Sequence, residues 1–111
     1  MYTHLARFTA VTGKREDLVW RFSMAIEGLL GIEGLHDYSI YEGDGDTVWV
    51  IEQWTSKFDH DASLNVPGTR EFIAETMPLI ANVESFPITY RGGVHKDAYD
   101  PEDDEPPDDH P

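Results

Sequence analysis

The sequence predicts an α+β fold, in which a four-stranded antiparallel sheet carries two long helices on one face. Three observations support this prediction. Four segments are rich in β-favouring residues, at 2–12, 35–42, 47–55 and 84–91. Two longer segments between them repeat apolar residues at helical spacing. A "GDGD" turn at 43–46 joins the two middle strands. The resulting order, βαββαβ, is the ferredoxin-like arrangement.

The first strand and the first helix are separated by the turn-forming stretch "VTGKRED". Glu16 and Asp17 are expected in the first helical turn, where the helix dipole favours anions. The helix is expected to run to about Leu30, because glycines follow it at 31 and 34. Its predicted core stripe consists of Leu18, Phe22, Ala25, Ile26 and Leu29.

The second half of the chain repeats the pattern of a helix followed by a strand. Ser56 and Asp59 have capping-box-like spacing for a short helix beginning near Lys57. Pro67 suits the first turn of a longer helix extending to about residue 82, and Pro78 is expected to kink it. The inner face predicted for this helix consists of Phe72, Ile73, Thr76, Ile80 and Val83.

The third predicted strand, "TVWVIEQW", is apolar on both of its faces. In a strand, successive side chains point to opposite faces of the sheet. Two helices can cover only one of these faces, and an apolar face left in water marks an interface. We therefore expect a homodimer that associates through the open face of the sheet.

Composition divides the chain into a domain at 1–96 and an acidic tail at 97–111. The tail holds eight of the 22 acidic residues and four of the seven prolines, with no lysine or arginine. Such a segment cannot bury enough apolar surface to order itself, so we expect it to be disordered. The domain carries 14 acidic and eight basic residues, a net charge of −6 rather than the −14 of the whole chain.

Several classes of function are disfavoured by composition. The absence of cysteine excludes disulfides, thiolate metal sites and a cysteine nucleophile. The absence of a basic patch argues against nucleic-acid binding. The absence of a long apolar run or a signal-peptide pattern favours a soluble cytoplasmic protein, without a membrane as partner.

The sequence resembles the antibiotic biosynthesis monooxygenase family, the dimeric α/β-barrel group that includes quinol monooxygenases. The resemblance covers about residues 3–90 and rests on "ARFTAVTGKRED", "EGLHDYSIYE", "VWVIEQWTS" and "DHDASLNVPGTREFIAETMPLIA". Its most specific part is the "EQW" triplet at 52–54, followed by a helix that contains a histidine and by "PLI" at 78–80.

The resemblance implies a monooxygenase that oxidises an electron-rich aromatic or quinol substrate with O₂, without flavin or metal as cofactor. An alternative is a non-catalytic barrel that binds a small ligand or has a structural role. Heme degradation is a third reading. It is weakened because relatives of that kind use an asparagine on the first strand, and "MYTHLARFTA" contains none.

His60 and Trp54 are the candidate catalytic residues. The ordinary pKa of histidine suits proton transfer near neutral pH. The family places a histidine at the pocket mouth just after the third strand, although His60 lies one residue earlier than the commonest pattern. Trp54 would form a pocket wall or stacking surface. The alternatives are an exposed histidine on an acidic turn and a tryptophan that only packs.

The candidate substrate-binding residues include polar groups on several elements. Glu52 could act as a base, but we expect it to pair with Arg7 on the neighbouring strand. His4 and Tyr38 could point into a pocket from the first and second strands. Arg70 could hold a substrate oxygen, although an exposed ion pair with Glu71 or Glu75 is the simpler expectation.

A pocket between helices and sheet would be lined by Phe22, Ile26, Phe72 and Met77. Trp20 and Met24 lie opposite the core stripe of the first helix, where they are either exposed or in contact with a partner subunit or the tail. We predict no metal site. Asp59, His60 and Asp61 are consecutive and their side chains diverge on a helix, and "EGDGDT" lacks the glycine and the bidentate acid of a calcium loop.

Overall fold

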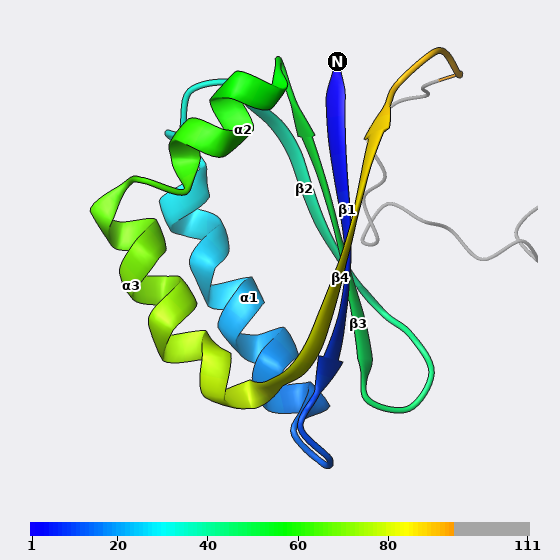
Figure 1. The fold of residues 1–111 in the computed structure, drawn as a ribbon, viewed down its shortest axis with the longest axis vertical. Coiled ribbons are helices and arrows are strands. Elements are labelled where there is room, and N and C mark those ends of the chain that lie inside the picture. The colour runs from blue at the N-terminus through cyan, green and yellow to red at the C-terminus, as the bar shows by residue number, and fades with distance from the viewer. Residues whose placement is uncertain (95–111) are drawn as a thin grey trace, which may run out of the picture.

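The computed structural model describes residues 1–94 and forms two layers, a sheet and a set of helices (Figure 1). The elements are β1 (Tyr2–Ala10), α1 (Arg15–Leu29), β2 (Leu35–Glu42), β3 (Thr47–Trp54), α2 (Lys57–Ser63), α3 (Pro67–Thr76), a 3₁₀ turn η1 (Met77–Leu79) and β4 (Ile80–Thr89). The predicted tail at 97–111 lies outside the described residues. Within residues 1–94, no helix is long and apolar enough to cross a membrane.

All four strands are antiparallel neighbours in the order β2-β3-β1-β4. The ferredoxin-like α+β fold with β1 and β3 at the centre is therefore confirmed. The "GDGD" hairpin is also present, with Gly45 at a φ of 59°, a conformation that glycine adopts without steric cost.

The second long helix is shorter than predicted. It ends at Thr76, Met77–Leu79 form a 3₁₀ turn, and β4 begins at Ile80 rather than at 84. Pro78 thus ends the α-helix instead of kinking it, because proline lacks an N–H and its ring clashes with the preceding turn. The predicted helical positions of Ile80 and Val83 were therefore wrong.

The core lies between α1 and the two central strands. Leu18 and Phe22 of α1 pack with Ala10, Val48 and Val50, all of which are buried. This settles the orientation of β3, because Val48 and Val50 face the helices and the alternation of the strand turns Trp49 and Ile51 outward. No helix in the described part of the chain covers this outer face (Figure 1).

Gly34 fixes how the loop after α1 meets α2. Its φ is +86°, and a Cβ built on it would lie 2.6 Å from the Cβ of Asp59. Its carbonyl accepts a hydrogen bond from the backbone N–H of Thr55, just after β3. The loop can therefore approach α2 this closely only with glycine at position 34.

We expect Gly34→Ala to lower the free energy of unfolding by at least about 1–2 kcal/mol, because alanine is strained at this φ and its methyl group collides with Asp59. Gly28→Ala is the matched control. Gly28 lies within α1 with open space around it, so alanine there should raise stability by about 0.5–1 kcal/mol. Urea denaturation at one fixed protein concentration measures both. Equal effects of the two substitutions would contradict this account.

Candidate active site

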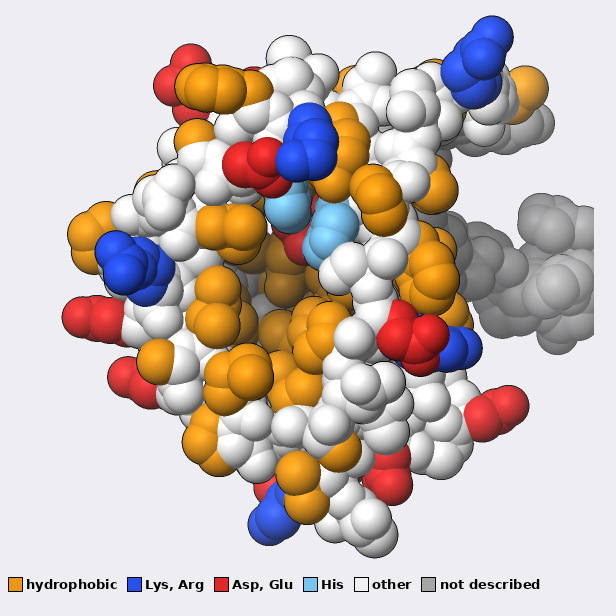
Figure 2. Space-filling view, in the orientation of Figure 1, with side chains coloured by type: hydrophobic (Ala, Val, Ile, Leu, Met, Phe, Trp, Pro, Cys, Tyr) orange, Lys and Arg blue, Asp and Glu red, His pale blue; other side chains and the backbone are white. Residues whose placement is uncertain are grey.

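A cavity of about 640 Å³ lies between the sheet and the helices. This volume is within the range of roughly 300–1,000 Å³ that is usual for small-molecule sites. Figure 2 shows the hollow surrounded by hydrophobic side chains, with pale blue histidine side chains at one end. The cavity therefore combines an apolar body with a polar end.

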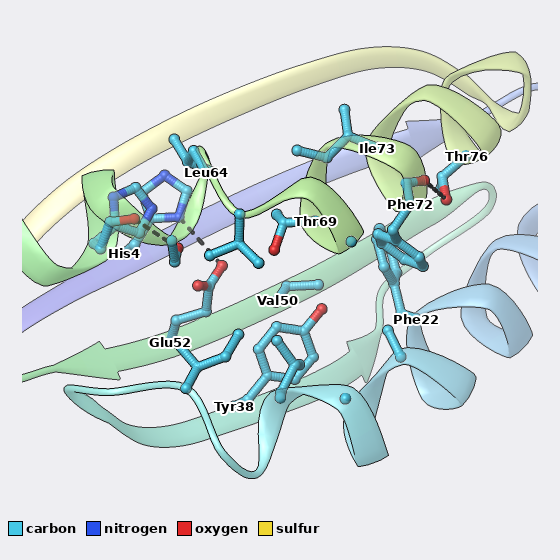
Figure 3. Close-up of a pocket in the computed structure, with 18 of the residues that line it drawn as sticks. His4, Phe22, Tyr38, Val50, Glu52, Leu64, Thr69, Phe72, Ile73 and Thr76 are labelled. Atoms are coloured by element: carbon cyan, nitrogen blue, oxygen red, sulfur yellow. Dashed lines mark hydrogen bonds and ion pairs between the residues drawn. The ribbon is translucent and has the colours of Figure 1, made fainter.

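The polar end consists of His4, Glu52 and His60, which come from β1, β3 and α2. The register of the sheet places His4 directly opposite Glu52. His4 Nδ1 lies 3.6 Å from Glu52 Oε2, and the rings of His4 and His60 are 4.6 Å apart between centroids. Figure 3 shows the carboxylate of Glu52 pointing toward His4, with Phe22 and Phe72 at the opposite end of the cavity.

Glu52 is held by the indole of Trp54, two residues further along the same face of β3. Trp54 Nε1 donates a hydrogen bond of 3.0 Å to Glu52 Oε1. Trp54 is almost completely buried, so its N–H needs a partner inside the protein. The second carboxylate oxygen remains directed at His4. Because side chains alternate along β3, Glu52 and Trp54 lie on the same face, and the strand therefore positions both the carboxylate and the indole that orients it.

His60 is positioned by the short helix α2. The Ser56 side chain caps this helix by accepting a hydrogen bond from the backbone N–H of Asp59. The ring of His60 packs edge-on against Trp54 with centroids 5.7 Å apart, and its Nδ1 lies 2.9 Å from Asp61 Oδ1. The other ring nitrogen, Nε2, is left for a second partner.

Asp61 also accepts a hydrogen bond of 2.6 Å from the Lys57 ammonium. This bond and the one with His60 hold the pKa of the Asp61 carboxyl below its ordinary value. Asp61 therefore keeps its negative charge at neutral pH and remains an acceptor for the His60 ring.

Tyr38 supplies a further polar group from β2. Burial raises the pKa of its phenol well above the ordinary value, and the Glu52 carboxylate adds to the shift. The phenol therefore stays neutral across the physiological range and can donate a hydrogen bond. Figure 3 shows its ring at the wall of the cavity.

Most of the predicted site residues line this cavity: His4, Phe22, Tyr38, Glu52, Trp54, His60, Phe72 and Met77. Ile26 and Arg70 do not. Ile26 is 39% exposed, since it lies about 100° around α1 from Ala25, which faces the cavity. Arg70 is exposed on α3 beside Thr69, which does line the cavity. Neither Ile26 nor Arg70 can contact a ligand there in this conformation.

The predicted pairing of Glu52 with Arg7 was wrong. Arg7 points to the outer face of the sheet, where it pairs with Glu84 and lies over the Trp49 ring at 5.5 Å. Arg7 and Glu52 belong to opposite phases of neighbouring strands, so they face different layers. Glu75, considered as a partner for Arg70, pairs with Arg21 instead at 3.1 Å.

Sequence reasoning missed several lining residues, among them Met24, Ser63, Leu64, Thr69 and Ser85. Met24 is 59% exposed and therefore lies at the rim, whereas Trp20, which was considered with it, is 61% exposed and does not line the cavity. Ser85 lies within the strand predicted at 84–91, but the sequence alone does not show which residues of that strand face the helices. Its alternation with outward-facing Glu84 would have identified it once the strand was placed.

The chain belongs to the family of antibiotic biosynthesis monooxygenases, whose model matches residues 1–75. No curated protein gives a significant match. The match includes β1, β3 and α2, the elements that carry His4, Glu52 and His60. The polar end of the cavity is therefore part of the family domain.

Solved structures share the fold. A protein of Chloroflexus aurantiacus with the provisional name antibiotic biosynthesis monooxygenase is 30% identical, with 85% of this chain and 96% of that chain covered and a TM-score of 0.72. SnoaB, a cofactor-independent oxygenase of Streptomyces nogalater, is 18% identical over 86% and 97%, with a TM-score of 0.73. Rv0793 of Mycobacterium tuberculosis is 20% identical over 85% and 98%, with a TM-score of 0.74.

We expect Glu52→Leu to lower the free energy of unfolding by about 1–3 kcal/mol, because the buried Trp54 N–H loses its acceptor. Glu52→Gln retains a side-chain oxygen for that N–H and should cost clearly less. Chemical denaturation followed by circular dichroism measures both variants. Glutamine that destabilises as much as leucine would show that the indole bond contributes little.

Proposed function

We propose that the protein is a cofactor-independent monooxygenase, which oxidises an electron-rich aromatic or quinol substrate with O₂. The observation that carries the proposal is the pair of imidazoles beside a carboxylate at one end of an apolar cavity of about 640 Å³. Membership of the monooxygenase family supports the type of reaction. The description of SnoaB as a cofactor-independent oxygenase supports a reaction that needs no cofactor.

The cavity suits a flat apolar molecule with one acidic group. Its aromatic walls include Phe22 and Phe72, whose centroids are 6.1 Å apart. A substrate lying along these walls would place its ionising group against His60 or His4, where the imidazole can accept the proton. A substrate that fills the cavity would displace water from around the resulting anion.

The oxidation needs only the substrate anion and O₂. The anion transfers an electron to O₂, and the radical pair combines to form a C–O bond and then a hydroperoxide. In an anthrone, loss of water from this hydroperoxide converts CH₂ into C=O, so that one oxygen atom enters the product and the other leaves as water. The Tyr38 phenol, which stays neutral, can donate a hydrogen bond to a developing oxyanion.

We expect the purified protein to accelerate O₂ uptake with a panel of anthrones and reduced naphthoquinols, without added flavin or metal. His60→Ala should lower the rate by about 10²–10⁴-fold, the usual contribution of a positioned acid or base. His36→Ala is the matched control, because His36 is exposed and bonds to Thr55 away from the cavity. An O₂ electrode measures uptake, and circular dichroism checks the fold.

No uptake above the spontaneous rate across the panel would contradict catalysis on these substrates and favour the ligand-binding alternative. Equal rates in His60→Ala and the parent protein would remove His60 from the reaction while leaving the oxygenase assignment in place.

We also propose that two chains associate through the outer face of the sheet. This face carries Trp49 and Ile51 at its centre and Tyr41, Phe86 and Ile88 further out, the last three being 53%, 38% and 47% exposed. A contiguous apolar face of this kind is unusual on a monomer. The Arg7–Glu84 pair in its midst adds polar complementarity.

We expect light scattering to give the mass of a dimer and Ile88→Lys to shift it toward the monomer, because a charge would be buried in the interface. Trp20→Lys is the control, since Trp20 is exposed on the helix layer, away from the outer face of the sheet. A monomeric parent protein, or a dimer unaffected by Ile88→Lys, would contradict the proposed interface.

A further inference from the structure

The polar end of the cavity has the composition of a metal site. His4, Glu52 and His60 each offer a ligand atom, and these atoms lie within 4.8 Å of one another. Two imidazoles and one carboxylate are a set that binds divalent first-row metals with coordination positions left open. The three side chains come from three different elements and all line the cavity. Figure 3 shows the carboxylate of Glu52 pointing toward His4.

The ligand atoms of His4 and Glu52 are already separated by nearly the distance that a metal site requires. His4 Nδ1 and Glu52 Oε2 are 3.6 Å apart. Two ligand atoms in a tetrahedral zinc site, each at about 2.1 Å from the ion, are separated by roughly 3.4 Å. All three ligand atoms lie within 4.8 Å of one another, so binding requires His60 to move closer to the other two.

Hydrogen bonds from neighbouring residues orient two of the proposed ligands, as such bonds do in metal sites generally. His60 Nδ1 bonds to the carboxylate of Asp61, which leaves Nε2 for an ion. Glu52 Oε1 is held by the Trp54 indole, which leaves Oε2. Hydrogen bonds of this kind from imidazole to carboxylate are the usual second contact of metal-bound histidine.

A buried ring nitrogen of His4 also favours a bound cation. Among the atoms of residues 1–94, its Nδ1 is buried and has no hydrogen-bond partner, although Glu52 Oε2 lies nearby. A buried nitrogen left in this way costs free energy. A cation between these two atoms would satisfy both of them.

We propose that His4, Glu52 and His60 bind one divalent first-row transition cation, with Zn²⁺ as the reference ion. The cation takes the imidazole lone pairs that the proposed function uses to accept a proton. Metal binding and the metal-free oxidation therefore exclude each other, and the cation acts as an inhibitor. This inhibition rests on the proposed function, whereas the binding itself does not.

Binding is tested on the chelator-treated full-length chain by calorimetric titration with Zn²⁺, and by the visible spectrum of added Co²⁺. Excess Mg²⁺ is present throughout, because it occupies oxygen-only acidic clusters and competes poorly for imidazole. We expect one Zn²⁺ per chain, with visible Co²⁺ bands of a low-coordinate site.

Four variants locate the ion. His4→Ala, Glu52→Gln and His60→Ala should each weaken Zn²⁺ binding more than tenfold, as roughly expected when a site loses a ligand. Asp61→Asn leaves the three ligands in place and should weaken it by about 10–100-fold through the orientation of His60. His36→Ala should bind as the parent does, and circular dichroism confirms that each variant is folded.

Absent Zn²⁺ binding, or binding that these variants leave unchanged, would overturn the site and favour an ion pair between protonated His4 and Glu52. O₂ uptake tests the inhibition separately: Zn²⁺ should lower the rate and a chelator should restore it. Uptake unaffected by saturating Zn²⁺ would overturn the exclusion. A protein that binds Zn²⁺ but consumes no O₂ would contradict the proposed function and leave the metal site standing.

Discussion

The carboxylate of Glu52 is the constraint on which the arrangement of the cavity depends. Its side chain is only 18% exposed and lies between the sheet and the helices, where an unpaired charge is costly. The protein meets this cost with a buried indole on one oxygen and an imidazole facing the other. Trp54 therefore has a role beyond packing, because its N–H determines which oxygen of Glu52 is free to interact with His4 or a ligand. Tyr38 keeps a neutral phenol because its own burial raises its pKa, and the charge of Glu52 raises that pKa further.

The alternation of β3 separates two tasks on one short strand. Val48, Val50, Glu52 and Trp54 share the face toward the helices and build first the core and then the polar end of the cavity. Trp49 and Ile51 point the other way, toward the face proposed for association. A slip of one residue in register would exchange the two sets and destroy both. This is the physical reason for a strand that is apolar on both sides and acidic at one position.

The sequence predicted the topology well because its signals are local. The hairpin glycines, the Ser56 cap and the helical spacing of Leu18 and Phe22 each act within a few residues. The site depended on pairings that are not local. Nothing in the sequence states that His4 lies opposite Glu52, and the register that decides it also turns Arg7 to the other face. The end of α3 was misjudged because helical periodicity continues through Pro78, although the backbone there cannot remain α-helical.

We propose that His4 and His60 together form the chemically active end of a ligand cavity. Nitrogen-detected NMR of the histidine rings tests it directly, under anaerobic conditions, with a reduced naphthoquinol added to the metal-free protein. We predict that the ring nitrogens of His4 and His60 shift together and saturate at one ligand concentration, while those of His36 stay in place. Shifts confined to His36, or no saturable shift at either cavity histidine, would contradict the claim.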